Sequence, residues 1–431
     1  MSVRGGPGAR VTGDGTLDEH IIIIGAGHGG VQAATSLREE GYQGALTLVS
    51  ADPELPYHKP PLSKTFLKAQ DAAPQILKAQ MFYDAQNIAL RLGSTVASID
   101  PTARTLTLED GATLAWSKLL LATGARPRRL AVPGSELDGV FYLRECADAR
   151  LLRERTAAAG DVVVIGGGFI GLEVAATMAM SGKRVTVVEA ADRLLGRAVS
   201  APVSSHMRAY HEGLGIRVLT RTGVRQISGQ DGDQDGGVRA VVTDAGEAIP
   251  ADAVLVGIGA EPDTRLAEAA GILCDNGIRV DAACRTSAPG IFAIGDCVSF
   301  PHQASGRVLR LESVQNATDQ ARCAAKAMLG RPADFDAVAW FWSDQGERKL
   351  QMAGLAFDID RQVLSGDLDA GAFAVFLFSG ERLVALETVN RPGEHMLGRR
   401  MLAAGFSPTD AQIAEGPAAL KAALAAHGMS P

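Results

Sequence analysis

Short apolar runs recur along the chain, and two of them lead into glycine-rich turns. The first covers residues 20–24, where four consecutive isoleucines precede the sequence GAGHGG at 25–30. The second covers residues 161–165 and leads into GGGFIG at 166–171, followed by an Ala/Met-rich stretch. An apolar run of this length is typical of a strand buried on both faces of a parallel sheet. The pattern therefore predicts a strand, a tight turn and a helix at each place.

Both turns carry the glycine spacing GxGxxG, which binds the pyrophosphate of a dinucleotide. The first glycine permits the turn, the second lets the backbone approach the phosphates, and the third allows the helix to pack closely on the strand. Each motif is followed by a comparable hairpin and strand, which indicates an internal duplication with two dinucleotide sites. The motif glycines are Gly25, Gly27 and Gly30 in the first turn and Gly166, Gly168 and Gly171 in the second.

The strand after each motif distinguishes the two sites. The expected strand at 184–188 is followed by Glu189, eighteen residues beyond the last motif glycine. This is close to the roughly 20 residues at which a carboxylate binds the ribose hydroxyls of NAD. Glu189 would repel the 2′-phosphate of NADP, although Arg193 and Arg197 keep NADP open, because arginine is the usual partner of that phosphate. After the first motif only Asp52 could play the same part.

Composition narrows the class of protein. The 431 residues are 46% hydrophobic, with 49 glycines and 5% aromatics, a balance that favours a multidomain α/β protein. Lys and Arg number 42 against 49 Asp and Glu, so no general excess of positive charge points to nucleic acid. No apolar run approaches the roughly 20 residues of a membrane span. Five cysteines without CxxC spacing argue against a disulfide scaffold or a metal site. We expect a cytoplasmic protein that binds no metal, nucleic acid or membrane.

Further motifs lie outside the two glycine turns. They are PYHKPPLSK at 56–64, ATGARPR at 122–128, GIGAEPDT at 257–264, IFAIGDC at 291–297, RLESVQNA at 310–317 and WFWSDQ at 340–345. Together with the turns, they give the chain a resemblance to the FAD-dependent bacterial ferredoxin reductases of the putidaredoxin and rhodocoxin reductase type, which have the glutathione reductase fold. The resemblance spans about residues 20–425.

The resemblance implies an α/β protein with two Rossmann-like dinucleotide-binding domains, the second inserted in the first, and a C-terminal α+β domain. Residues 1–19, which lack the apolar core of a secretion signal, are expected to be a disordered tail. The implied domains are 20–127 with 255–331 for FAD, 128–254 for NAD, and 332–425 for the C-terminal domain. In the last, we expect strands near 338–342, 349–356 and 372–378 and helices near 394–404 and 417–426.

The resemblance also implies roles for individual residues. Lys64 and Glu173 would form an ion pair beside flavin N5, and Asp296 would hydrogen-bond the ribityl chain of FAD. A helix from about 312 to 329 would point its N-terminus at the pyrimidine edge of the flavin, where the helix dipole favours negative charge. Lys59 stands where relatives usually carry arginine, so the charge is kept but the bidentate geometry is lost.

The candidate site residues fall into three sets. Trp342, with Trp340, would cover the flavin or lie at a docking face, and ordinary core packing is an equal alternative. The catalytic candidates are Lys64 and Glu173; the FAD candidates are Gly25, Gly27, Gly30, Asp52, Lys59, Lys64, Ala122, Thr123, Gly124, Arg126, Asp296, Val314 and Trp342; and the NAD candidates are Gly166, Gly168, Gly171, Glu189, Arg197 and Gly259.

The implied reaction is transfer of electrons from NADH through FAD to a 2Fe-2S ferredoxin that serves a monooxygenase or dioxygenase. No cysteine precedes Cys146, which argues against the thiol chemistry of disulfide reductases of this fold. Arg391, Arg399 and Arg400 are candidates for a basic patch facing an acidic ferredoxin, with a solvated helix face as the alternative. Two other functions stay open: a rubredoxin reductase, and a redox-sensing flavoprotein resembling apoptosis-inducing factor, in which a slow reaction with NADH switches association.

Overall fold

The computed structural model describes residues 19–69, 71–229 and 237–428. Nearly all of the expected N-terminal tail lies outside the described residues, as do residues 230–236, part of the Gly/Asp/Gln-rich run at 229–237 that the composition predicts to be a surface loop. The chain divides into two compact units. The first unit comprises Met1–His58, Gln75–Arg126 and Glu261–Ala337, and the second comprises Lys59–Pro74, Pro127–Ala260 and Val338–Pro431.

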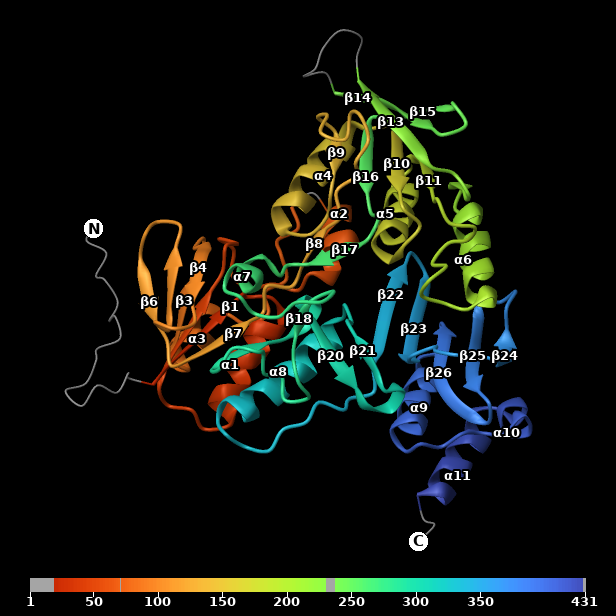
Figure 1. Cartoon of the computed structure of the whole chain (residues 1–431). Helices are drawn as coiled ribbons and strands as arrows, with labels where there is room; N and C mark the ends of the chain where they lie inside the picture. The colour runs from red at the N-terminus through yellow and green to blue at the C-terminus, as the bar shows by residue number, and fades with distance from the viewer. Residues whose placement is uncertain (1–18, 70, 230–236, 429–431) are drawn as a thin grey trace, which may run out of the picture. The chain divides into compact units, whose positions relative to one another are not determined.

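A five-stranded parallel sheet forms the centre of the first unit, with the strand order β19-β7-β1-β2-β3. The four isoleucines of β1 are at most 6% exposed, as expected for the middle strand of a sheet with both faces covered. Helices α1 and α8 lie side by side along this sheet (Figure 1). The elements are β1 (His20–Ile24), α1 (His28–Glu39), β2 (Ala45–Val49), β3 (Ile88–Arg91), β7 (Lys118–Leu121), β19 (Ile291–Ala293) and α8 (Val314–Met328).

A second five-stranded parallel sheet, ordered β12-β11-β10-β16-β9, lies in the second unit. In both sheets the strand before the glycine turn, β1 or β10, is the central one. The next parallel strand in the sequence, β2 or β11, pairs directly with it, and this shared strand order agrees with the internal duplication. A three-stranded antiparallel sheet accompanies each: β4-β5-β6 and β13-β14-β15. The second unit has β9 (Val140–Phe141), α4 (Cys146–Ala158), β10 (Asp161–Ile165), α5 (Phe169–Met180), β11 (Arg184–Val188), α6 (Ala201–Gly213), β12 (Arg217–Leu219) and β16 (Ala253–Val256).

The last part of the chain forms an antiparallel sheet, β22-β23-β26-β25-β24, whose apolar core includes Phe376, Leu386 and Met401. Two of its strands, β24 and β26, were not expected from the sequence. Strand β24 is a half-exposed edge strand with few apolar residues, and β26 places the polar pair Glu387 and Thr388 in the interior. The elements are β22 (Trp340–Gln345), β23 (Arg348–Gly354), β24 (Arg361–Asp367), β25 (Ala372–Ser379), β26 (Arg382–Val389), α9 (Pro392–Ala403), α10 (Asp410–Glu415) and α11 (Pro417–His427).

Shorter elements connect these sheets. Their positions confirm the two hairpins expected near residues 110 and 245. They are η1 (Pro60–Ser63), α2 (Thr65–Lys68), α3 (Gln80–Ala85), β4 (Val96–Asp100), β5 (Thr105–Leu108), β6 (Thr113–Ala115), β8 (Ala125–Pro127), β13 (Val224–Gly229), β14 (Val238–Thr243), β15 (Ala248–Pro250), β17 (Ala260–Pro262), α7 (Arg265–Ala269), β18 (Ile278–Arg279), η2 (Gly295–Cys297), β20 (Val298–His302), η3 (Gln303–Ser305) and β21 (Arg307–Leu309).

Glu387 explains why β26 tolerates a carboxylate in its interior. The side chain is 2% exposed and accepts hydrogen bonds from the backbone N–H of Ser200 at 3.0 Å and from its hydroxyl at 2.5 Å. Ser200 is the residue directly before α6, so the carboxylate satisfies a free N–H at that helix N-terminus. Burial nevertheless raises the pKa of Glu387. The contact joins the C-terminal sheet to the segment that carries the second parallel sheet.

No helix in the described residues is long and apolar enough to cross a membrane.

Buried histidines make the stability of the protein depend on pH. His20 is 8% exposed with its Nε2 2.8 Å from the Thr47 hydroxyl, and burial lowers its pKa from the ordinary 6.5. Burial likewise lowers the pKa of His211 and His395. Because the unfolded chain then binds more protons than the folded one, stability is present above the unfolded pKa and is lost as pH falls.

We therefore expect the unfolding temperature to fall between about pH 7 and pH 5, with each buried histidine contributing at most about 1.4 kcal/mol per pH unit. Replacement His20→Gln removes one titrating group and should flatten this dependence, measured by circular dichroism melts of both proteins. Glu387, whose pKa is raised, acts with the opposite sign in both proteins and so cancels in the comparison. An unchanged slope in the variant would contradict the assignment of His20 as a neutral buried group.

Candidate functional site

The two glycine turns have the same backbone geometry. Gly25 has φ +106° and Gly166 has φ +107°, a region that favours glycine. The N–H of each donates to the end of the following strand at 2.8 Å, to Val49 O and Val188 O respectively. A Cβ on Gly25 would lie 2.2 Å from the carbonyl oxygen of Ala122, so only glycine fits between the two strand ends.

The remaining motif glycines divide into close-packed and open positions. A Cβ on Gly30 would lie 1.9 Å from the Gly25 carbonyl oxygen, and one on Gly171 would lie 2.3 Å from that of Gly166. A Cβ on Gly27 would have no atom within 4 Å, and a Cβ on Gly168 would have its nearest atom 4.0 Å away. The open space lies at the N-termini of α1 and α5, where a pyrophosphate would meet free N–H groups. Both turns therefore fit a dinucleotide.

The start of α8 offers buried polar groups of the kind a flavin ring would satisfy. Asn316 and Gln320 are fully buried, and Asn316 Oδ1 and Gln320 Nε2 have no hydrogen-bond partner within the described structure. Gln320 Oε1 accepts from the N–H of Gly295 at 2.7 Å, which ties α8 to the turn that carries Asp296. Ser313 caps the helix, directly before Val314. Unpaired buried polar atoms are costly, so these residues fit a bound FAD.

The end of β7 leads into a segment tied to residues 261–263. The Thr123 hydroxyl donates to Asp263 O at 2.7 Å, and the Asp263 N–H donates to Gly124 O at 2.9 Å. Arg126, which the sequence suggested as a phosphate partner, lies 3.1 Å from Glu261, with both side chains at least one-third exposed. Its assignment to FAD stays a prediction.

Two further FAD candidates already have partners in their own surroundings. Asp52 accepts from the Glu54 N–H at 3.0 Å and from the Tyr57 hydroxyl at 2.7 Å, so both carboxylate oxygens are engaged. Lys59 Nζ lies 2.5 Å from Glu145, the residue directly before α4. Of the predicted FAD residues, Lys59, Lys64 and Trp342 belong to the second unit and the others to the first.

Glu189 reaches back over the second glycine turn. Its Oε2 accepts from the Gly167 N–H at 2.6 Å and its Oε1 from the Ala191 N–H at 2.7 Å. The guanidinium of Arg193 donates to Val199 O at 2.8 Å and to Gly196 O at 2.6 Å, which occupies it with backbone carbonyls. Arg197 is exposed.

Gly259, the remaining NAD candidate, lies in the second unit. It has φ +103° and no atom within 4 Å of its Cβ position. Like the middle glycines of the two turns, it leaves open space beside the backbone.

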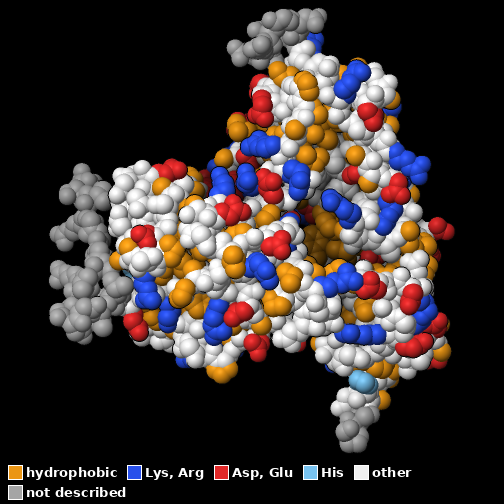
Figure 2. Space-filling model, viewed as in Figure 1, with side chains coloured by type: hydrophobic (Ala, Val, Ile, Leu, Met, Phe, Trp, Pro, Cys, Tyr) orange, Lys and Arg blue, Asp and Glu red, His pale blue; other side chains and the backbone are white. Residues whose placement is uncertain are grey.

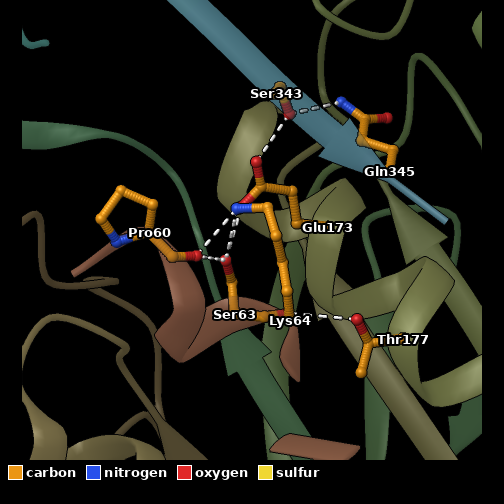
Figure 3. A network of polar contacts seen from close by, with 7 residues as sticks. All are labelled: Pro60, Ser63, Lys64, Glu173, Thr177, Ser343 and Gln345. Carbon is orange, nitrogen blue, oxygen red and sulfur yellow. Dashed lines mark hydrogen bonds and ion pairs between the residues drawn. The ribbon is translucent and has the colours of Figure 1, made fainter. Parts of the chain in front are cut away.

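The second unit brings the catalytic candidates together, as the sequence suggested (Figure 3). Lys64 Nζ lies 2.6 Å from Glu173 Oε2, and Glu173 is only 5% exposed. Lys64 also donates to Pro60 O at 2.9 Å, and the Ser63 hydroxyl donates to Glu173 Oε2 at 2.5 Å. Thr177, one turn beyond Glu173 in α5, donates to the Ser63 carbonyl oxygen at 3.1 Å. The buried carboxylate is thereby paired and hydrogen-bonded, as a buried charge requires.

Three further buried residues, not expected from the sequence, continue this network. The Ser343 hydroxyl donates to Glu173 Oε1 at 2.7 Å, and Gln345 Nε2 donates to Ser343 Oγ at 3.2 Å (Figure 3). His211 Nε2 lies 2.8 Å from Gln345 Oε1. An amide oxygen only accepts, so His211 carries its proton on Nε2. The hydrogen bonds from His211 through Gln345 and Ser343 then all donate in the direction of Glu173. Ser343 and Gln345 flank Asp344 in WFWSDQ and alternate with it between the interior and the surface of the strand. The available signal in the sequence was this run of polar residues directly after three aromatic ones.

Aromatic side chains of β22 lie beside α9 and the second glycine turn. Trp340 and Trp342 stack with ring centroids 5.5 Å apart, and Phe341 packs on Phe169 at 4.6 Å. Arg399 lies over Trp340, 4.3 Å from the ring centroid. The tryptophans are partly exposed, and Arg399 extends the aromatic surface with a positive charge.

The other two arginines of the suggested basic patch differ. Arg391 donates to Glu394 at 2.7 Å, which neutralises it locally, whereas Arg400 is exposed. On the face drawn in Figure 2, Lys and Arg side chains are interspersed with Asp and Glu, without a broad region of one sign. Of the three arginines, Arg399 and Arg400 are therefore left as candidates for a basic patch on α9.

Known families match most of the chain. The family described as Pyridine nucleotide-disulphide oxidoreductase matches residues 19–321, and the domain described as Reductase C-terminal matches residues 340–424. The match confirms the expected fold class, and with it the FAD and NADH cofactors.

Curated proteins and solved structures agree with this match. Rhodocoxin reductase of Rhodococcus erythropolis is 44% identical over 408 residues, covering 94% of this chain and 95% of that protein. A ferredoxin–NAD(P)(+) reductase of Sphingomonas sp is 40% identical over 387 residues, covering 89% and 92%. The crystal structure of a ferredoxin reductase from Rhodopseudomonas palustris matches with a TM-score of 0.91 at 41% identity, covering 94% of this chain and 100% of that one. The covalent putidaredoxin reductase–putidaredoxin complex also gives 0.91, at 37% identity and covering 96% and 99%. The chain therefore belongs to the pyridine nucleotide-disulphide oxidoreductase family, in the branch that carries the C-terminal reductase domain.

Proposed function

We propose that this chain passes electrons from NADH through FAD to a 2Fe-2S ferredoxin, which in turn serves a monooxygenase or dioxygenase. The relatives named as rhodocoxin, putidaredoxin and ferredoxin reductases support this partner class. The proposal includes the domain boundaries expected from the sequence and a cytoplasmic location.

The observation that carries this proposal is the absence of any cysteine before Cys146, in a chain whose family is named for disulphide reduction. The five cysteines form no disulfide in the described structure, and four of them are buried. Without a thiol pair after the first glycine turn, electrons have to leave from the flavin itself. An acceptor that takes single electrons, such as an iron-sulfur protein, suits that exit.

The residues of this chain would position and shield the reacting atoms. When bound, FAD accepts a hydride from NADH and gives up the electrons one at a time. Lys64, fixed by Glu173, Ser63 and the Pro60 carbonyl, would hold a positive charge at one place beside the flavin. Because the donors of the network converge on Glu173 within the protein interior, they would hold the side chains of Lys64 and Glu173 in place between turnovers.

Our first functional prediction concerns the acceptor. The purified flavoprotein should reduce a 2Fe-2S ferredoxin with NADH, and it should leave oxidised glutathione, thioredoxin and peroxide unreduced. Alkylation of accessible thiols should leave ferredoxin reduction intact, because no cysteine takes part in the electron path. The measurement is NADH oxidation coupled to ferredoxin absorbance, before and after alkylation.

Three outcomes separate the alternatives. Disulfide turnover that is lost on alkylation would overturn the assignment. Faster reduction of rubredoxin than of ferredoxin would replace the partner, and slow flavin bleaching by NADH with dimerisation would favour the redox sensor. A ferredoxin rate that falls as salt rises would support docking through Arg399 and Arg400, since salt screens opposite charges.

The second prediction concerns the nicotinamide nucleotide. Glu189 lies at the second turn with its charge held by two backbone N–H groups, so kcat/KM should favour NADH over NADPH by at least about tenfold, or about 1.4 kcal/mol. Replacement Glu189→Gln should narrow this ratio. Equal use of both nucleotides by the unaltered protein would instead assign the 2′-phosphate to Arg197, because Arg193 is occupied.

The third prediction concerns Ser343 as a positioning residue. Ser343→Ala removes one donor to a buried carboxylate, and we expect hydride transfer to FAD to slow about tenfold, a loss of about 1.4 kcal/mol. The affinity for NADH should stay unchanged, because Ser343 orients Glu173 and does not face a nucleotide motif.

Stopped-flow reduction of the bound flavin measures both quantities without any ferredoxin. Ser343→Thr, which keeps the hydroxyl, should restore the rate, and Ser365→Ala on β24 of the same sheet is the matched control. A weaker affinity for NADH with an unchanged limiting rate would show that the network binds nucleotide and does not orient Lys64.

A further inference from the structure

Two cysteines of the first unit face each other in its interior. Cys284 lies in the turn between β18 and β19, and Cys323 lies in α8. Cys323 Sγ is 3.6 Å from Ala282 O, two residues before Cys284. Cys284 Sγ is 3.8 Å from Gln320 O, one helical turn before Cys323. Each sulfur thus contacts the segment that carries the other.

The backbone conformation at Cys284 is unusual for a cysteine. Cys284 has φ +61°, a left-handed conformation that residues other than glycine, asparagine and aspartate seldom adopt. Two other cysteines contact different groups: Cys297 donates to Ile294 O at 3.2 Å, and Cys274 donates to Ile272 O at 3.4 Å. Their contacts do not involve Cys284 or Cys323, so the pairing is specific to one site.

The two thiols differ in chemical character. The neighbouring Cys284 thiol lowers the pKa of Cys323, and the charge of Lys326 acts in the same direction, while burial and the charges of Asp334 and Asp281 act against it. The Cys323 thiol, together with burial, raises the pKa of Cys284. Cys323 is 8% exposed and Cys284 1%. Cys323 is therefore the sulfur that a small oxidant would reach first, and Cys284 is its more deeply buried neighbour.

We propose that Cys323 and Cys284 form a peroxide-sensitive site that closes into a disulfide. The Cys323 thiolate attacks one oxygen of hydrogen peroxide, which forms the sulfenic acid and releases hydroxide. The Cys284 sulfur then attacks the Cys323 sulfur and displaces the hydroxyl group, which leaves as water with the Cys284 proton. In total two thiols are oxidised, and one peroxide is reduced to two waters. A thiol reductant reverses the bond.

The disulfide would enclose a functional segment. Between the two cysteines lie β19, the turn with Asp296, and Ser313–Asn316 at the start of α8. These are the residues of the first unit proposed to meet the ribityl chain and ring of FAD. A covalent link across the segment lowers the conformational entropy that the segment gains when it opens locally. The oxidised protein should therefore release FAD more slowly. This site is independent of the proposed electron acceptor.

Peptide mapping of the intact flavoprotein tests the site. After brief treatment with hydrogen peroxide, alkylation and digestion, mass spectrometry should find a Cys284–Cys323 cross-link and a loss of about 2 Da, the mass of two hydrogens. Dithiothreitol should remove the cross-link. Cys323→Ser and Cys284→Ser should abolish it, while Cys274→Ser should keep it. The map of the unaltered protein decides the question even where a variant fails to fold.

Two results would overturn the proposal. One is oxidation of Cys323 to sulfinic acid while Cys284 stays alkylatable, and the other is cross-linking that involves Cys274 or Cys297 instead. For the effect on FAD, release into a filtrate should slow on oxidation, and the unfolding temperature should rise by roughly 2–4 °C. An unchanged release rate in cross-linked protein would refute the link between this disulfide and the FAD segment.

Discussion

The carboxylate of Glu173 is the interaction on which the candidate catalytic centre depends. It accepts hydrogen bonds from Lys64, Ser63 and Ser343, which come from two segments far apart in the sequence. A buried carboxylate that loses one donor leaves charge unpaired in the interior, at a cost of about 1–3 kcal/mol or more. The segment at 59–74, helix α5 and strand β22 are therefore held together by a polar centre, which also fixes where the Lys64 charge stands.

The duplicated fold shows how one backbone design serves two nucleotides. The turns at Gly25 and Gly166 agree to within one degree in φ and make the same strand contact. The difference lies in the carboxylate that follows the second strand of each unit. Glu189 extends back to the Gly167 N–H, whereas Asp52 turns toward Glu54 and Tyr57 in its own loop. The placement of this side chain therefore gives each turn a different environment, while the turn itself only provides a place for phosphate.

Sulfur chemistry has a different place in this chain from the one its family name suggests. No cysteine stands near the first turn in sequence, and the electron path that we propose from the flavin contains no thiol pair. The two cysteines that do meet, Cys284 and Cys323, lie where the segment between β18 and β19 contacts α8. The oxidation that we propose for this pair takes no part in turnover.

The sequence by itself determined the features that depend on local spacing. Both glycine turns, the strands around them and the duplication followed from motifs, because sterics at a turn act over only a few residues. The pairing of Lys64 with Glu173, which are 109 residues apart, was implied only by the resemblance to a known family. Strand β26 was missed because its interior position includes Glu387, and the role of Ser343 was missed because its partner is 170 residues away. The occupation of Arg193 by backbone carbonyls and the meeting of Cys284 with Cys323 were likewise decided by the tertiary structure. Hydrogen bonds and thiol contacts of this kind depend on distances between folded segments, which no spacing along the chain encodes.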